Sequence, residues 1–189
     1  MDINNLREVI LAFVPVCEQE REDRRMMLEY MDLFHNLLVR ENEIAHFTAS
    51  SWLVNADRTR ALMVYHNIYR SWSWTGGHAD GDANLLSVAQ REAMEETGLT
   101  SVRPISPFPM SLEILPVPAH IKRGKYVVPH LHLNLTYALD ADEKAPIPTR
   151  PEENSAARWF TLDEAVSHSE EKDMRIIYSK LNEWIRTHE

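Results

Sequence analysis

The hydrophobic residues at the start of the chain recur with the period of an α-helix. Leu6, Val9, Ile10 and Phe13 follow this spacing before Pro15. A second, longer segment repeats the pattern with methionines, leucines and a phenylalanine between residues 27 and 38. Residues 1–43 are therefore expected to form a helical extension. Side chains of these kinds at helical spacing are usually core, so we expect a helical cap on the rest of the protein or the surface of a possible homodimer.

From residue 46 on, the pattern changes to that of β-strands. Strands are expected over Phe47 to Val54 and over Ala61 to His66, with the polar turn of residues 55–60 between them. A further strand-like piece runs from Ser111 to Leu115. Two strands joined by a short polar turn indicate a hairpin, so we expect a sheet to begin here.

The most strongly patterned strand lies between residues 130 and 137. Its apolar residues are Leu131, Leu133, Leu135 and Tyr137, and they alternate with His130, His132, Asn134 and Thr136. Because successive side chains of a strand point to opposite faces, one face is expected to join the core and the other to be polar. The two histidines are either ligands for a metal or substrate, or part of a half-solvated sheet surface.

The end of the chain is expected to contain one more strand and two helices. A short strand at residues 157–160 precedes Thr161 and Glu164, whose spacing is that of a capping box at a helix start. A final helix is expected over residues 173–186. Its apolar side consists of Ile176, Ile177, Leu181, Trp184 and Ile185.

The middle of the chain is expected to form a helix over residues 84–98, after a glycine-rich loop at residues 74–82. Glu92, Glu95 and Glu96 are neighbours on its surface, because side chains three and four positions apart lie close together. Like charges at this spacing repel, and no lysine at a matching position neutralises them. A divalent cation that prefers oxygen ligands would stabilise the cluster, whereas a solvated acidic face is the alternative.

Residues Gly77 to Leu99 resemble the signature of the Nudix hydrolase family. That signature runs glycine, five residues, glutamate, seven residues, Arg-Glu, an aliphatic residue, any residue, Glu-Glu, any residue, glycine and an aliphatic residue. The chain departs from it twice, since Ala83 stands at the first glutamate and Ala93 in the first aliphatic position. The matching positions are Gly77, Arg91, Glu92, Glu95, Glu96, Gly98 and Leu99.

The resemblance extends over about residues 44–170 and implies a fold. That fold is the α+β Nudix fold, an α/β/α sandwich with a mixed central sheet. The expected division of the chain is an N-terminal helical extension of residues 1–43 and a Nudix hydrolase domain of residues 44–189.

The same resemblance implies a metal-dependent hydrolase that cleaves a phosphoanhydride bond in a small nucleoside-diphosphate-linked or related substrate. Mg²⁺ or Mn²⁺ would be held by Glu92, Glu95, Glu96 and the carbonyl group of Gly77. Arg91 would orient one of the carboxylates through a bidentate bond. Its alternative role is an ordinary surface ion pair.

The general base of such enzymes often comes from a loop outside the signature. Here the polar connection of residues 140–154 offers Glu152 and Glu153. Glu153 is the preferred candidate because it is nearer the following strand, and Glu92 is its main competitor. Both loop carboxylates can also be solvated charges without a role.

Two other functions are compatible with the resemblance. A catalytically silent Nudix-like domain would bind a nucleotide as a sensor, and Ala83 is the only hint of it. Isopentenyl-diphosphate isomerases share the fold, but in that family a cysteine occupies the place of Gly76. Substrate-binding candidates of lower weight are Tyr65, Tyr69, Trp72, Trp74 and the basic turn of residues 122–125.

Composition limits the partners further. The chain has 189 residues, of which 44% are hydrophobic, enough for one substantial core. Its net charge of -9 argues against a nucleic-acid polymer as substrate, and a small phosphorylated anion would need a cation to approach. Cys17 is the only cysteine, so no disulfide forms within the chain. With no signal peptide and no apolar run long enough for a membrane, the protein is expected to be cytoplasmic.

Overall fold

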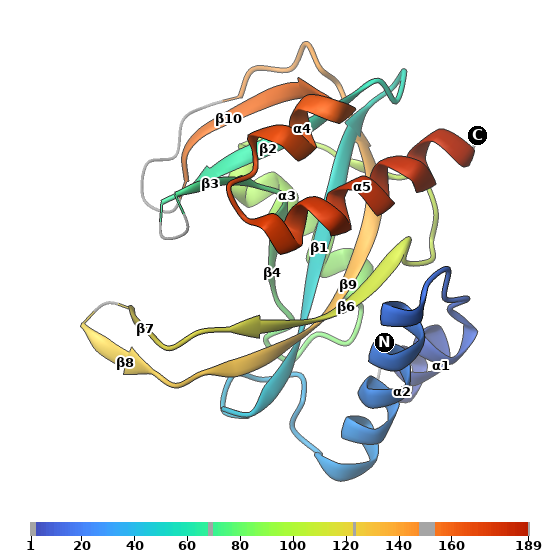
Figure 1. Ribbon diagram of the computed structural model, residues 1–189, viewed down its shortest axis with the longest axis vertical. Helices are drawn as coiled ribbons and strands as arrows, with labels where there is room; N and C mark the ends of the chain where they lie inside the picture. The colour runs from blue at the N-terminus through green and yellow to red at the C-terminus, as the bar shows by residue number, and fades with distance from the viewer. Residues whose placement is uncertain (1–2, 68–69, 123, 148–153, 189) are drawn as a thin grey trace.

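The structure, a computed structural model, describes residues 3–67, 70–122, 124–147 and 154–188, and within them it has five helices and ten strands (Figure 1). The helices are α1 (Ile3–Ala12), α2 (Glu18–Leu33), α3 (Leu85–Thr97), α4 (Leu162–His168) and α5 (Lys172–Thr187). The strands are β1 (Ala45–Asn55), β2 (Arg60–His66), β3 (Ser71–Ser73), β4 (Thr75–His78), β5 (Arg103–Pro104), β6 (Ser111–Val117), β7 (His120–Lys122), β8 (Lys125–Val127), β9 (His130–Ala141) and β10 (Asn154–Thr161).

Eight of the strands form one mixed sheet. Its central order is β10-β2-β1-β9-β5, and β3, β4 and β6 pair with β2, β1 and β9, respectively. The two long strands β1 and β9 are parallel, whereas the other pairs are antiparallel. Strands β7 and β8 form a separate hairpin that extends away from the body as an arm (Figure 1).

Helices cover both faces of this sheet, as the predicted α/β/α sandwich requires. Apolar side chains of α1, α2 and α3 join one hydrophobic core, and those of α4 and α5 join the other. Strand β1 contributes to both cores, with Phe47 and Ala49 on the first side and Trp52 and Val54 on the second. None of the described helices combines the length and the apolar composition needed to span a bilayer.

The N-terminal extension is less helical than predicted. Helix α2 ends at Leu33, where Phe34 takes up an extended backbone, and residues 34–44 continue without helix. Leu37 is nevertheless buried in the first core, and its carbonyl group accepts a hydrogen bond of 2.7 Å from the backbone N–H of Phe47. The prediction was wrong here because an apolar residue can reach the core from a turn, and Asn42 favours a turn by accepting bonds from the next backbone N–H groups.

A buried ion cluster connects the N-terminal helices to the C-terminal helix. The Nζ atom of Lys180 on α5 lies 2.7 Å from Oε1 of Glu20 on α2 and 3.0 Å from Oε1 of Glu113 on β6. Both carboxylates are almost completely buried, and burial raises the pKa of Glu113. The positive charge of Lys180 therefore stabilises the two carboxylates in their buried positions.

The polar face of β9 is buried at Asn134 and Thr136, so the alternative of a half-solvated surface does not hold there, whereas His130 and His132 are half-buried. Asn134 and Thr136 are covered, and their hydrogen bonds go to neighbouring strands. Asn134 accepts bonds of 3.0 Å from Thr48 and 2.8 Å from Ser50 of β1, and Thr136 donates one of 3.3 Å to Glu113. Polar residues are stable there because the strands on either side present matching donors and acceptors.

Part of the glycine-rich segment, predicted as a loop over residues 74–82, is strand β4. Its residues pair with β1 in antiparallel register, with Gly77 opposite Ala49 and His78 opposite Thr48. The two glycines allow a close approach, since a Cβ atom on Gly76 would lie only 2.8 Å from the carbonyl oxygen of Ala49. The strand therefore brings bare backbone into the centre of the fold.

The C-terminal elements largely follow the prediction. Thr161 and Glu164 form the expected capping box at the start of α4. Helix α5 also turns the expected side to the core, where Leu181 and Ile185 are buried and Ile177 and Trp184 pack against them. Ile176 is the exception, since it is 73% exposed, whereas Tyr178 is buried. Ile176 lies about 200° around the helix from Tyr178. The apolar residues are spread along this helix, so their spacing did not show that Ile176 faces the solvent.

Candidate metal centre

Helix α3 has the ends that were predicted for it. The side chain of Asn84 accepts a hydrogen bond of 3.3 Å from the backbone N–H of Ser87, and Gly98 ends the helix with a φ angle of 73°. Leu85, Val88, Ala89 and Ala93 are buried in the first core. These residues fix one side of α3 in the core. The glutamates therefore lie beside the buried side of the helix, in a fixed orientation.

Glu92 lies directly against Gly77 of β4. A Cβ atom added to Gly77 would be 2.3 Å from Cδ and 2.4 Å from Oε2 of Glu92. The carboxylate thus occupies the space that the missing side chain leaves free. This contact brings together two of the positions that the sequence predicted as metal ligands.

Glu96 also reaches β4, whereas Glu95 faces solvent. Oε2 of Glu96 accepts a hydrogen bond of 3.1 Å from the backbone N–H of Gly76, and the side chain of Glu96 is half-buried. Glu95 is exposed on the same helix. Two carboxylates therefore meet the backbone of β4, and the third lies next to them at the surface.

Arg91 lies against one of these carboxylates. Nη2 of Arg91 lies 3.3 Å from Oε1 of Glu92, a single contact rather than the bidentate bond that was expected. Burial, and secondarily the charge of Glu95, raises the pKa of Glu92. Hard, negatively charged oxygen donors in a partly desolvated place fit Mg²⁺ or Mn²⁺, so the residues present are suited to such an ion.

Ala83 belongs to the core rather than to the candidate site. It is 2% exposed and lies in the same hydrophobic cluster as Leu85 and Val88. At the position of the signature's first glutamate, this chain therefore has a small apolar side chain packed in the core.

The turn after β4 is held by the segment that follows α2, which the sequence did not indicate. Nε of Arg40 donates a hydrogen bond of 2.7 Å to Oδ1 of Asp80, and this bond holds the pKa of Asp80 below its usual range. The backbone N–H of Gly81 donates to the carbonyl group of Leu38 at 2.8 Å. The N-terminal extension therefore supports the turn between β4 and α3.

Several other predicted candidates stay away from the carboxylates or cannot be placed. Glu152, Glu153, Tyr69 and Arg123 lie outside the described residues. Trp72 packs edge-on against Phe160, and Trp74 packs edge-on against Tyr178, so both serve the second core. Tyr65 in turn contacts Trp72.

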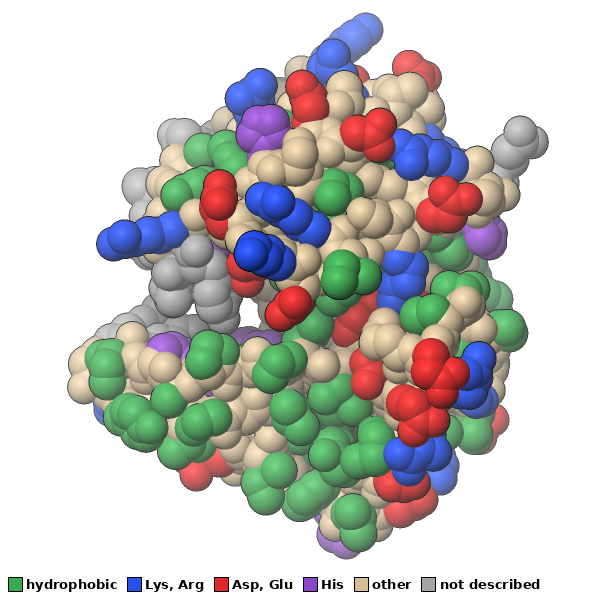
Figure 2. All heavy atoms as spheres, viewed as in Figure 1, with side chains coloured by type: hydrophobic (Ala, Val, Ile, Leu, Met, Phe, Trp, Pro, Cys, Tyr) green, Lys and Arg blue, Asp and Glu red, His purple; other side chains and the backbone are tan. Residues whose placement is uncertain are grey.

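His130 and His132 are joined by two histidines that were not singled out in the sequence. The ring of His46 on β1 lies 4.9 Å from that of His130 and 5.1 Å from that of His132, measured between centroids. His78 of β4 lies 4.9 Å from His132. Figure 2 shows histidine side chains along the hollow above the arm of β7 and β8. Only the pairing of distant strands brings these four rings together.

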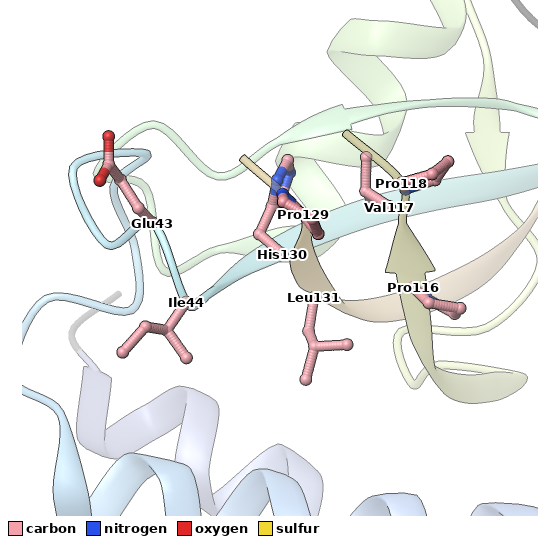
Figure 3. A pocket seen from close by; sticks show the side chains of 8 residues that line it. All are labelled: Glu43, Ile44, Pro116, Val117, Pro118, Pro129, His130 and Leu131. Carbon is pink, nitrogen blue, oxygen red and sulfur yellow. The ribbon is translucent and has the colours of Figure 1, made fainter. Parts of the chain in front are cut away.

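A pocket of about 550 Å³ adjoins this histidine group on one side. It is mainly apolar, and His130 is one of its lining residues while none of the three signature carboxylates is (Figure 3). In Figure 3 the side chains of His130 and Leu131 point in opposite directions, as neighbours on a strand do. The lining consists of Glu43, Ile44, Pro116, Val117, Pro118, Pro129, His130 and Leu131.

Comparisons with known proteins agree with this architecture. The model of the NUDIX domain family matches residues 45–184. Among solved structures, the E. coli dihydroneopterin triphosphate pyrophosphohydrolase has a TM-score of 0.53 at 14% identity, over 71% of this chain and 92% of its own. A C. elegans Ap4A hydrolase has a TM-score of 0.51 at 17% identity, over 74% and 97%. The M. smegmatis Nudix hydrolase RenU has a TM-score of 0.53 at 18% identity, over 75% and 86%. No curated protein matches the sequence.

Proposed function

This chain belongs to the Nudix family of pyrophosphohydrolases, and from that premise we propose that it hydrolyses a phosphoanhydride bond in a small nucleoside-diphosphate-linked or related substrate with Mg²⁺ or Mn²⁺. The observation that carries the proposal is the meeting of α3 with β4, where Glu92 lies against Gly77 and Glu96 accepts from the N–H of Gly76. If this acidic helix face were only solvated, two of its carboxylates would not be expected to contact the backbone of β4.

Glu92, Glu95 and Glu96 would hold the cation, together with the carbonyl oxygen of Gly77. Bound there, a divalent cation supplies charge neutralisation for the bridging phosphates and a coordinated water of lowered pKa. The chain's own contribution is positioning, because attack on phosphorus depends mainly on alignment and on stabilisation of charge. The N–H of Gly76 fixes the orientation of Glu96, and contact with Gly77 fixes that of Glu92.

Arg91 and Glu153 have supporting roles in this proposal. Arg91 restrains the carboxylate of Glu92 through the 3.3 Å contact and leaves the other oxygen of Glu92 for the cation. Glu153 is proposed as the base that accepts a proton from the attacking water, with Glu92 as the competing candidate. A separate base is favoured because a carboxylate committed to the cation is a weak proton acceptor.

The isomerase alternative is disfavoured by the packing of Gly76. A Cβ atom at this position would lie 2.6 Å from Oγ of Ser50 and 2.8 Å from the carbonyl oxygen of Ala49. A cysteine could not occupy this position without displacing the backbone of β1. The sensor alternative predicts binding without turnover, and the experiment below distinguishes it from a hydrolase.

The test is a screen of phosphoanhydrides with Mg²⁺ and with Mn²⁺, read by mass spectrometry of the products. The panel contains nucleoside triphosphates, nucleotide sugars, ADP-ribose, Ap4A and dihydroneopterin triphosphate, the last two being named for structural neighbours. We expect metal-dependent hydrolysis of at least one compound. Binding without product from any compound would favour the sensor.

Variants of the carboxylates make the test specific to α3. Glu95→Gln and Glu96→Gln are each expected to remove most activity, because an amide oxygen binds a hard cation more weakly than a carboxylate does. Stability without metal should be unchanged or slightly higher, since each change removes repulsion between like charges. Glu183→Gln, on the exposed side of α5, removes the same charge elsewhere and serves as the control. Near wild-type turnover by both α3 variants at saturating Mg²⁺ would contradict the metal assignment.

A further inference from the structure

The histidine group lies on the opposite face of the sheet from the carboxylates of α3. His46 and His132 are direct partners in the parallel pairing of β1 with β9, so their side chains point to the same face. Gly77 is paired with Ala49, whose side chain belongs to the first core, on the face that α3 covers. The side chains of β1 and β9 alternate between the two faces of the sheet. The histidines lie on the face opposite to the one that α3 covers.

Hydrogen bonds at Nδ1 direct the lone pairs of two of these histidines to the interior of the group. Nδ1 of His46 lies 3.0 Å from the carbonyl oxygen of Asn42, and Nδ1 of His130 lies 2.9 Å from that of Val128. A carbonyl oxygen can only accept, so each Nδ1 carries the proton and each Nε2 keeps a lone pair. A histidine that binds a metal through one nitrogen typically donates its other N–H in this way.

His46 supplies an independent indication of a ligand. It is 4% exposed, and its Nε2 atom is buried without a hydrogen-bond partner. A buried nitrogen with an unused lone pair is costly unless something binds to it. The rings of His130, His132 and His78 lie 4.9, 5.1 and 5.1 Å from that of His46. Of these, His130 and His132 offer ligand nitrogens that lie close enough to share one ion with it.

The distances fit one metal ion after a small adjustment. Nε2 of His130 and Nε2 of His132 are 3.2 Å apart and share a hydrogen bond, which a bound metal ion would replace. This distance is close to the roughly 3.3 Å expected between two nitrogens that bind one tetrahedral Zn²⁺. One ligand nitrogen from each of the three histidines lies within 4.8 Å of those of the other two. A shift of about 1.5 Å in the ring of His46 would bring all three to the distances of a Zn²⁺ site.

The surroundings of His46 and His132 favour the neutral ring, which is the form that binds a metal. Burial, and then the neighbouring histidines, lowers the pKa of His132 to about 2, and burial lowers the pKa of His46. The positive charge of Arg40 contributes to lowering both pKa values, and Arg40 forms an ion pair with Asp80.

We propose that His46, His130 and His132 form a second metal site, which takes one Zn²⁺ or a similar imidazole-preferring divalent cation. Three imidazoles without a carboxylate select such an ion over Mg²⁺, whose preferred ligands are oxygens. Three protein ligands leave one tetrahedral position for water or an anion. The site is independent of the hydrolytic function proposed above.

Zinc titration of the metal-free full chain tests the proposal. With excess Mg²⁺ present to occupy the carboxylates of α3, isothermal calorimetry should show one Zn²⁺ bound per chain, and Co²⁺ in its place should give the visible absorption of a tetrahedral site. His130→Gln should weaken Zn²⁺ binding by at least the roughly tenfold that the loss of an outer-shell partner alone costs. Its matched control is His120→Gln, because the Nδ1 atom of His120 also bonds the carbonyl oxygen two residues before it, at 3.0 Å, but on β7 and outside the group.

A second measurement needs no variant and so does not depend on the folding of one. The X-ray absorption spectrum of the zinc-loaded wild type should show nitrogen ligands from three imidazoles. A spectrum dominated by oxygen ligands, unchanged affinity in His130→Gln, or loss of affinity in His120→Gln would overturn the proposal. Glu95→Gln should bind Zn²⁺ at this site as the wild type does, and loss of zinc binding in that variant would likewise contradict it.

Discussion

Replacing Gly77 with alanine should displace Glu92 without unfolding the protein. The new Cβ atom would be 2.3 Å from Cδ and 2.4 Å from Oε2 of Glu92, whereas carbon atoms in good contact are about 3.5 Å apart. The carboxyl group must therefore move by about 1 Å. A displacement of this size in a catalytic group costs about a hundredfold in rate, or about 2.7 kcal/mol in the barrier.

The stability of Gly77→Ala should change little for two reasons. The atoms in the way belong to the end of a flexible side chain, and alanine reduces the entropy of the unfolded chain, which stabilises by about 0.4–1 kcal/mol. Gly76→Ala offers a contrast, because its Cβ atom would meet the backbone carbonyl oxygen of Ala49 at 2.8 Å. That variant should lose several degrees in melting temperature.

The assay combines metal binding with turnover. Mn²⁺ binding measured by electron paramagnetic resonance requires no knowledge of the substrate, and kcat is then measured with a compound from the screen. We expect weaker Mn²⁺ binding and lower kcat for Gly77→Ala at a melting temperature close to that of the wild type. Wild-type Mn²⁺ affinity and kcat would refute the argument that the contact between Gly77 and Glu92 positions a metal ligand.

Three further predictions concern other parts of the chain. Ala83→Glu should lower the melting temperature, since it buries a carboxylate in the core, and a rate increase above about tenfold would contradict a structural role for this position. Lys180→Met should cost about 3–5 kcal/mol at pH 7, or about 6–20 °C in melting temperature, by stranding Glu20 and Glu113. Because acid protonates the stranded carboxylates, this deficit should shrink at pH 5, and an equal deficit at both pH values would exclude the charge argument. Glu153→Gln should lower kcat about a hundredfold at unchanged Mn²⁺ affinity, whereas parallel losses would make Glu153 a ligand.

Local patterns in the sequence were sufficient for the ends of α3, for the start of α4 and for the acidic face of α3. The Asn84 cap, the left-handed Gly98 and the capping box of Thr161 and Glu164 depend on residues a few positions apart, and all three are present in the fold. The neighbourhood of Glu92, Glu95 and Glu96 on one helix follows from helical geometry alone. These features were predictable because each depends on interactions within a single turn or helix.

The tertiary structure decided which distant residues meet. The parallel pairing of β1 with β9 joins Thr48 to Asn134, 86 positions apart, and the same pairing places His46 beside His132. Periodicity identifies the side of a strand that is apolar, but it carries no information about which strand becomes the neighbour. The burial of Asn134 and Thr136 on β9 and the histidine group therefore could not be read from the spacing of residues, because both depend on strand order.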